Sequence, residues 1–247
     1  MEALNYLCLP YIGSNTVVEH QMAYTGKRLF DLMASGLGLL LLSPLLLLIA
    51  VWIKLDSPGT VFFVQKRVGC KGRDFRLYKF RSMIRQEWES GLLITIGERD
   101  KRITTAGYFL RKYKLDELPQ LFNVFVGDMS IVGPRPLVRQ QTEIYPDAYR
   151  EVLEVKPGIT CRASILFSNE DELLGMANHP EEFFSEVLMP AKIRINVEDA
   201  KDQSFSADLR MICSTITKRN RQRLSQVLTA EEIALCHKYL DRFPENF

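Results

Sequence analysis

The hydrophobic and polar positions divide the chain into one long apolar run, a short alternating region and a series of helical patterns. The apolar run contains 22 consecutive uncharged residues, 32–53, which as a helix would extend about 33 Å at 1.5 Å per residue. A secretory signal peptide is excluded because the run starts too far into the chain, is too long and has no small-residue cleavage site after it. The run is therefore expected to lie in a membrane.

Ser43 and Pro44 interrupt the middle of this run. Proline removes one backbone hydrogen bond and kinks a helix, and a serine beside it can donate to a freed carbonyl. Basic residues flank both ends, with Lys27 and Arg28 before the run and Lys54 after it, whereas a crossing helix normally has its cations mainly on one side. The charge and the proline fit two alternatives about equally well. One is a kinked helix that crosses the membrane once, and the other is a re-entrant pair of helices whose two ends lie on the same side of the membrane.

Two segments after the apolar run alternate apolar with polar residues and are rich in aromatic and β-branched residues. Segments 60–66 and 74–80 are predicted to be strands, and the glycines of 69–72 form a turn between them. A β-hairpin is therefore expected. Arg76 and Lys79 of the second strand lie next to an apolar face, where a solvated position and a phosphate contact explain each of them equally well.

Helical periodicity resumes on both sides of two adjacent acids, Asp116 and Glu117. Segments 103–113 and 118–126 predict two helices, and the acids then fall at the N-cap and first turn of the second, where Pro119 is also tolerated. Acids are favoured there because they complement the helix dipole. Capping is thus the first explanation for the pair.

The rest of the chain is predicted to be mostly helical. Segment 137–155 forms one helix, and a turn at 156–160 leads into a short strand at 163–167. Pro180 marks a helix start, with His179 before it, and Pro190 marks a break.

Two further helices follow near the C-terminus. Segment 205–216 is amphipathic and runs into a basic stretch, so it can lie at the headgroup level of a membrane, although packing on the protein's own core is the commoner reason for such a pattern. Thr229 and Glu232 form a capping box that opens a final helix. The expected fold is α+β and helix-rich, with a small β-hairpin.

Composition and charge narrow the classes of function. The chain is 25% charged and 47% hydrophobic with a formal net charge of +2, as in a folded protein. Its five cysteines are scattered and odd in number and its three histidines are isolated, which supports no disulfide framework, zinc site or histidine-based triad. The sequence contains neither of the glycine-rich nucleotide-binding motifs, GxGxxG after a strand or GxxxxGK(S/T). Segment 66–85 holds eight basic residues against one acid, which points to an anionic ligand or surface.

The acid pair stands among the residue types that a phosphate-handling site needs. The cationic segment 111–114 precedes it, and Asp128 and the rigid turn 133–136 follow it. Carboxylates can hold a divalent cation or attack phosphorus, and guanidinium groups bind phosphate oxygens. This context favours chemistry over capping.

Seven blocks occur in the order found in bacterial sugar transferases, and the sequence resembles the monotopic phosphoglycosyl transferases. The blocks are KRLFD (27–31), SP (43–44), YKFRSM (78–83), LDELPQLFNV (115–124) with Arg111 before it, GDMS (127–130), VGPRP (132–136) and PGIT (157–160). The resemblance covers about residues 25–217. It implies a re-entrant membrane helix at 25–57 broken at Ser43 and Pro44 and a catalytic domain at 58–217. The residues themselves predict an extension of mixed character at 1–24, interfacial amphipathic helices, and a basic segment with a C-terminal helix at 218–247.

The resemblance implies a monotopic enzyme of the bacterial inner membrane with its catalytic domain on the cytoplasmic face. Such an enzyme moves a sugar-1-phosphate from a UDP-sugar to a polyprenyl phosphate, with undecaprenyl phosphate expected, and releases UMP in a reaction that requires Mg²⁺. Its partners are these two substrates and membrane lipid, with no nucleic acid, and a homo-oligomer stays open. The alternatives are a membrane adaptor that binds acidic lipid and a glycosyltransferase that releases UDP.

The resemblance also implies roles for individual residues. Asp116 is the expected nucleophile with Glu117 as its partner, and the phosphate and metal site also includes Lys79, Arg111, Asp128 and Arg135, with Asp116 and Asp128 as the metal ligands. Many relatives continue PGIT with GWAQ and an Asn-Gly-Arg turn, whereas CRASILF follows here. Arg162 is therefore only a candidate for holding the second phosphate or the sugar.

Overall fold

The computed structural model of the chain describes residues 25–84, 102–201, 203–217 and 224–240. The expected N-terminal extension, the basic segment 218–223 and most of segment 83–98, which the sequence suggests is a surface loop, lie outside the described residues.

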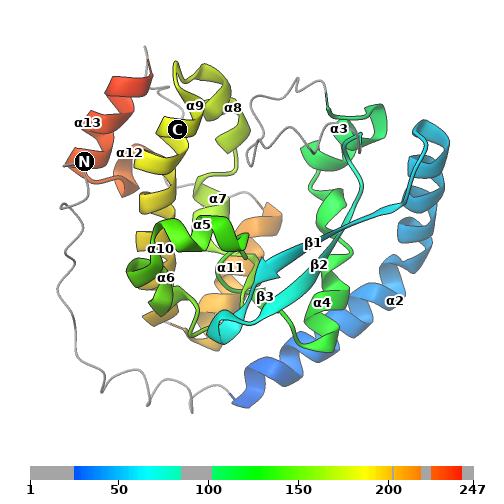
Figure 1. Cartoon of the computed structure of the whole chain (residues 1–247). Coiled ribbons are helices and arrows are strands. Elements are labelled where there is room, and N and C mark those ends of the chain that lie inside the picture. Colours follow the sequence, from blue (N-terminus) through cyan, green and yellow to red (C-terminus); the bar gives the residue numbers. More distant parts are fainter. Residues whose placement is uncertain (1–24, 85–101, 202, 218–223, 241–247) are drawn as a thin grey trace.

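The long apolar run forms α2 (Thr25–Asp56), a helix long and apolar enough to cross a membrane. Pro44 lies inside α2, so the segment that the charge pattern left open as a pair of helices is one continuous helix, which changes direction along its length (Figure 1). Because Pro44 has no N–H, the carbonyl of Leu40 loses its usual partner. The Ser43 hydroxyl donates to that carbonyl at 2.8 Å, as predicted.

The alternating region forms the predicted antiparallel hairpin of β1 (Phe62–Val68) and β2 (Asp74–Phe80), with a single 3₁₀ turn, η1 (Cys70–Gly72), between them. In its register Phe63 is opposite Lys79 and Arg67 is opposite Phe75. Since opposed residues and alternate residues of a strand share a face, Arg67 and Lys79 lie on the same face of the hairpin.

Two helices and a turn follow the hairpin. They are α3 (Thr105–Lys112), the 3₁₀ turn η3 (Leu115–Glu117) and α4 (Gln120–Val126), which match the two predicted helices at 103–113 and 118–126. Thr104 caps α3, since its side chain accepts a hydrogen bond from the N–H of Gly107 at 2.9 Å.

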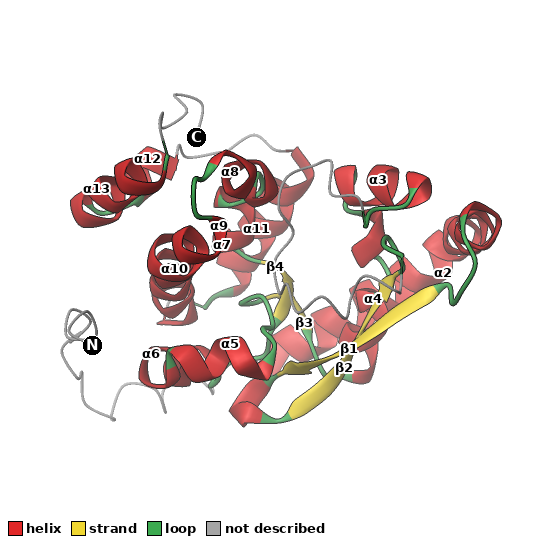
Figure 2. Ribbon diagram, turned by 45° about the horizontal axis from the view of Figure 1, so that its top comes forward, coloured by secondary structure: helices red, strands yellow, loops and turns green. Residues whose placement is uncertain are grey.

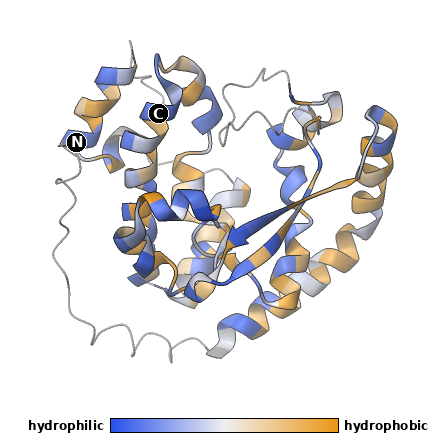
Figure 3. Cartoon of the chain, viewed as in Figure 1, coloured by the Kyte–Doolittle hydropathy of each residue, from blue (hydrophilic) through white to orange (hydrophobic). Residues whose placement is uncertain are grey.

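Both ends of α2 are fastened to this part of the chain. At the N-terminal end Arg28 donates to the carbonyls of Val124 and Phe125 at 2.6 and 2.8 Å. At the other end Arg81 donates to the carbonyl of Ser57 at 2.7 Å. Between these anchors α2 is apolar along most of its length (Figure 3), and many of its apolar side chains are exposed.

A second, parallel pair of strands consists of β3 (Ser130–Val132) and β4 (Gly158–Thr160). The connection between them contains α5 (Arg139–Ile144) and α6 (Pro146–Val152), so the single helix predicted over 137–155 is wrong. Pro146 occupies the first position of α6, where its missing N–H is tolerated, and it cannot continue a preceding helix.

The chain after β4 is helical. Its first helix is α7 (Arg162–Leu166), with Cys161 as its N-cap, so the strand predicted at 163–167 is wrong. The helices α8 (Glu170–Met176), α9 (Pro180–Phe183) and α10 (Met189–Lys201) follow, with a π-helical turn, η4 (Phe184–Leu188), between the last two. Pro180 starts α9 as predicted, but Pro190 lies in the first turn of α10 and does not break the helical path.

The described part ends with α11 (Phe205–Thr217), α12 (Leu224–Val227) and α13 (Ala230–Tyr239). The predicted capping box of Thr229 and Glu232 is confirmed. Helix α13 packs Cys236 and Tyr239 into one buried core with Phe183 and Leu188. Figure 2 shows α12 and α13 on the opposite side of the molecule from α2, whereas Phe205 of α11 contacts Phe30 of α2 with ring centroids 5.4 Å apart. The whole is helix-rich with a small hairpin, as expected.

Candidate active site

Asp116 and Glu117 lie in η3, one turn before α4. Lys114 precedes them in the left-handed conformation, with φ 56° and ψ 23°, and the N-cap of α4 is Pro119. The prediction that the acids cap this helix is therefore wrong. The turn instead buries both residues, with 6% of Asp116 and 9% of Glu117 exposed, and buried carboxylates need partners or a reason to be protonated.

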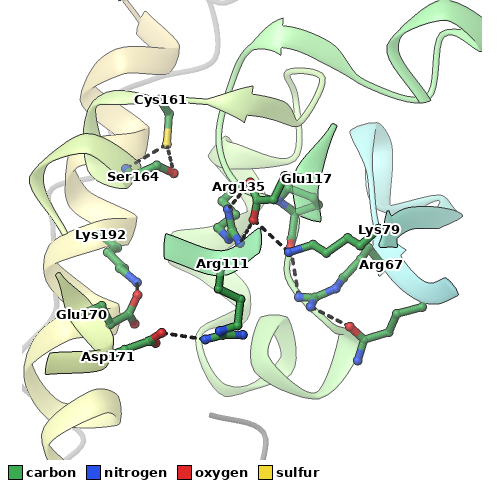
Figure 4. Close-up of polar contacts among 12 residues, drawn as sticks. Arg67, Lys79, Arg111, Glu117, Arg135, Cys161, Ser164, Glu170, Asp171 and Lys192 are labelled. Atoms are coloured by element: carbon green, nitrogen blue, oxygen red, sulfur yellow. Dashed lines mark hydrogen bonds and ion pairs between the residues drawn. The ribbon is translucent and has the colours of Figure 1, made fainter. Parts of the chain in front are cut away.

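Glu117 has two cationic partners. Lys79 donates from Nζ to Oε1 at 2.9 Å, and Arg135 donates to Oε1 at 2.6 Å and to Oε2 at 3.4 Å (Figure 4). Although burial works in the opposite direction, Arg135 and Lys79 hold the pKa of the Glu117 carboxyl well below its usual range. Glu117 is thus an ionised carboxylate with both oxygens occupied.

Asp116 is different from its neighbour. Its Oδ1 atom is buried and has no hydrogen-bond partner. Burial raises the pKa of the Asp116 carboxyl, Lys79 opposes this effect, and the charge of Glu117 adds to it. The turn therefore presents one carboxylate that is fixed by cations and one whose oxygen is left for another group.

Arg135 is held in place by the turn that the sequence analysis singled out. The carbonyl of Pro134 accepts a hydrogen bond from the N–H of Gly158 at 2.9 Å, and the Tyr149 hydroxyl donates to the carbonyl of Arg135 at 3.2 Å. A Cβ atom on Gly158 would lie 2.1 Å from the backbone nitrogen of Gly133. Glycine is required there so that the turn can approach β4 and aim Arg135 at Glu117.

Arg67 joins this group, although the sequence analysis did not assign it to the site. It donates to the carbonyl of Pro136 at 3.1 Å and to Gln65 at 2.6 Å. Burial, and secondly the charge of Arg135, lower the pKa of Arg67 to about 10. Alternation along the first strand would have found it, because Arg67 shares a face with Lys79.

The other predicted site residues lie outside this cluster. Arg111 pairs with Asp171 of α8 at 2.6 Å, yet it is near enough to lower the pKa of Asp116. Arg162 pairs with Glu198 at 2.6 Å, on α10.

Asp128 is exposed and follows the C-terminal end of α4, whereas Asp116 precedes its N-terminal end. The helix α4, seven residues and about 10 Å long, lies between the two acids. Among the described residues no group of three histidine, cysteine, aspartate or glutamate side chains could hold a metal ion.

A magnesium ion nevertheless fits what this site offers. Mg²⁺ in phosphoryl-transfer enzymes keeps several waters and takes only one or two carboxylates besides the substrate's phosphates. The unpartnered buried Oδ1 of Asp116 is a suitable ligand, since a cation there would counter the effect of burial on its ionisation.

The chain is similar in sequence to a known protein family and to several of its members. The model of the family described as bacterial sugar transferase matches residues 22–222. The chain is 36% identical over 192 residues to the uncharacterized sugar transferase EpsL of Bacillus subtilis, a match that covers 78% of this chain and 86% of EpsL.

Two other relatives carry more specific names. The chain is 36% identical over 167 residues to the exopolysaccharide production protein ExoY of Rhizobium meliloti, covering 61% of this chain and 73% of ExoY. It is 46% identical over 145 residues to the UDP-N-acetylgalactosamine-undecaprenyl-phosphate N-acetylgalactosaminephosphotransferase of Aeromonas hydrophila, covering 57% of this chain but only 34% of that protein.

Proposed function

The chain belongs to the bacterial sugar transferase family and is a transferase, and on this premise we propose that it moves a sugar-1-phosphate from a UDP-sugar to a polyprenyl phosphate. The reaction releases UMP and passes through a covalent phospho-sugar intermediate on Asp116. Undecaprenyl phosphate, the acceptor named for the Aeromonas relative, is the proposed acceptor.

The observation that carries this proposal is the unequal partnering of the two acids. Both oxygens of Glu117 are held by Lys79 and Arg135, so attack by Glu117 would require breaking a buried ion pair. Asp116 has a buried oxygen without a partner, so attack by Asp116 would break no such pair. A membrane adaptor, in contrast, needs the acids only as helix caps, and they do not cap α4.

The proposed reaction has two steps, and side chains of the site assist both. An oxygen of Asp116 forms a bond to the phosphorus that carries the sugar while the bond to UMP breaks, and UMP leaves with the electron pair. An oxygen of the polyprenyl phosphate then displaces the carboxylate. Arg135 and Lys79 bring positive charge to phosphate oxygens that would otherwise repel Asp116. Mg²⁺, when bound, neutralises further phosphate charge and keeps Asp116 ionised.

The anchoring of α2 supports a monotopic placement in the membrane. Arg28 near the start of α2 donates to the carbonyl of Val124 in the following domain, and Arg81 of that domain donates to the carbonyls of Ile53 and Ser57 at the end of α2. A helix whose two ends are tied to one domain cannot place them on opposite sides of a hydrocarbon core about 30 Å thick. The helix therefore enters and leaves by one face. The flanking Lys27 and Lys54 favour the cytoplasmic one.

Exposed aromatic side chains extend this apolar surface beyond α2. Phe109 of α3 contacts Trp52 of α2 with ring centroids 5.4 Å apart, and Phe122 and Phe125 of α4 are also exposed. Aromatic rings are favoured at the membrane interface. Helices α3 and α4 therefore rest at the headgroup level, which keeps η3 close to the phosphate of a lipid acceptor.

The experiment that tests the proposal omits the acceptor. The protein is incubated with a UDP-sugar and Mg²⁺, and intact-protein and peptide mass spectrometry are expected to find one phospho-sugar on Asp116, with UMP released. Asp116→Asn is expected to abolish the adduct, whereas Glu117→Gln leaves the site able to form it slowly. UMP release only after polyprenyl phosphate is added, with no adduct under fast quench, would show a direct reaction instead, and release of UDP would show transfer of the sugar without its phosphate.

A further inference from the structure

A cavity of about 740 Å³ borders the turn that holds Arg135. Helices α7, α10 and α11 form its walls, and Gly133 and Pro134 form part of its lining. Its volume is in the range of small-molecule sites. Pro134 lines the cavity while the next residue, Arg135, contacts Glu117, so a ligand there lies beside the proposed phosphate site.

The cavity contains polar groups without protein partners. Asn196 of α10 is 6% exposed, lines the cavity and has a buried Oδ1 with no hydrogen-bond partner. The Nε of Arg162 is buried and unpartnered in the same way, although the ends of its guanidinium pair with Glu198 and Asp199. A buried polar atom left without a partner is costly. Two such atoms in one cavity indicate a polar ligand that satisfies them.

The lining favours a sugar over a nucleobase. Among the described residues that line the cavity none is aromatic, so a base would have no ring to stack on. Amide and carboxylate side chains face apolar ones such as Ile165 and Met211. Such a mixture suits a ring with hydroxyl groups and apolar C–H faces.

We infer that this cavity receives the sugar ring of the donor and that Asn196 accepts a hydrogen bond from one of its hydroxyl or amide groups. The inference rests on the proposed function, because it places the sugar next to the phosphate that Arg135 binds. Arg162, a candidate from the sequence, then contacts the sugar and not the second phosphate.

The test uses the full chain in lipid nanodiscs with polyprenyl phosphate and Mg²⁺. UDP-glucose, UDP-galactose and their two N-acetylamino counterparts serve as donors, and calorimetry measures the Kd of UMP, which has no sugar to place in the cavity. Asn196→Ala is expected to lower kcat/KM for the best donor by about tenfold and to reduce its preference over the other donors. The Kd of UMP stays unchanged.

A second variant does not depend on deleting a buried side chain. Ala207→Phe adds a ring on α11 at the cavity wall and is expected to give the same pattern, loss of kcat/KM without loss of UMP affinity. Gln140→Ala, which removes an exposed amide on α5 away from the cavity, serves as the control and is expected to match the wild type.

Three results would overturn the inference. Equal weakening of UMP would place the nucleoside in the cavity, and variants with unchanged kcat/KM and unchanged donor preference would show that the cavity is no donor site. A wild-type protein that binds UMP but transfers no phospho-sugar from any of the four donors would show that the proposed function itself has failed. That last failure is seen without any variant.

Discussion

Replacing Arg135 by lysine separates the charge of this side chain from its geometry. Arg135 contacts both oxygens of Glu117, at 2.6 and 3.4 Å, from a turn that fixes its backbone. A lysine keeps the positive charge but has a single donor group in place of the planar fork. It cannot contact both carboxylate oxygens and a substrate phosphate in the same way.

The expected loss of kcat/KM follows from how far the Arg135–Glu117 pair is exposed to solvent. Hydrogen bonds to charged groups contribute about 1.5–3 kcal/mol, and because 44% of the Arg135 side chain is exposed the lower end applies. About 1.5 kcal/mol corresponds to roughly a tenfold loss of kcat/KM for Arg135→Lys. Arg135→Ala is expected to lose about a hundredfold, since Glu117 then has only Lys79 as a partner.

The assay measures UMP release from a UDP-sugar with polyprenyl phosphate and Mg²⁺. Arg139→Lys is the matched control, because Arg139 pairs with Asp74 at the same 2.6 Å but with both side chains about half exposed, and such surface pairs contribute little. It should change kcat/KM by less than about twofold. Full activity of Arg135→Lys would refute the bidentate role, and equal losses in both lysine variants would show a general effect of the substitution.

Three further perturbations test other parts of the structure. Because burial raises the pKa of Asp116, its carboxyl in the Mg²⁺-free protein should titrate with a midpoint above about 4, which infrared difference spectroscopy of the wild type against Asp116→Asn measures; a midpoint below that value contradicts the assignment. Pro44→Ala returns an N–H donor to the carbonyl of Leu40 and should straighten α2. The straighter helix strains the contacts of Arg28 and Arg81 that tie its ends to one domain, and where these contacts break, cysteine labelling of the two flanks detects a change from one-sided to two-sided access. Gly107→Ala should lower the free energy of unfolding by more than about 2 kcal/mol, measured by urea titration, since the added Cβ would lie 1.9 Å from the backbone oxygen of Ser82. Gly26→Ala is the control and should change it little, because a Cβ there would have nothing within 4 Å.

The parts of the fold that the sequence predicted well are those with local causes. The length of the apolar run, the alternation around Lys79 and the capping box at Thr229 act within a few residues, and each was found where expected. Segment 163–167 shows the opposite case. A short apolar run fits a helix or a strand equally well, and here the N-cap at Cys161 and packing against α10 make it a helix.

The roles of the two acids show why the site could be predicted only in part. Asp116 and Glu117 are adjacent and chemically alike, so the local sequence does not distinguish which of them is a helix cap, a metal ligand or a nucleophile. They differ because Lys79 and Arg135, 38 and 18 residues away in the chain, both reach Glu117. That choice depends on the register of the hairpin and on the close approach of Gly133 to Gly158, which are long-range features. In the proposed mechanism the chain keeps one carboxylate free because Lys79 and Arg135 occupy the neighbouring one, and a change that shifts the hairpin relative to η3 is expected to alter which of the two acids is available to attack.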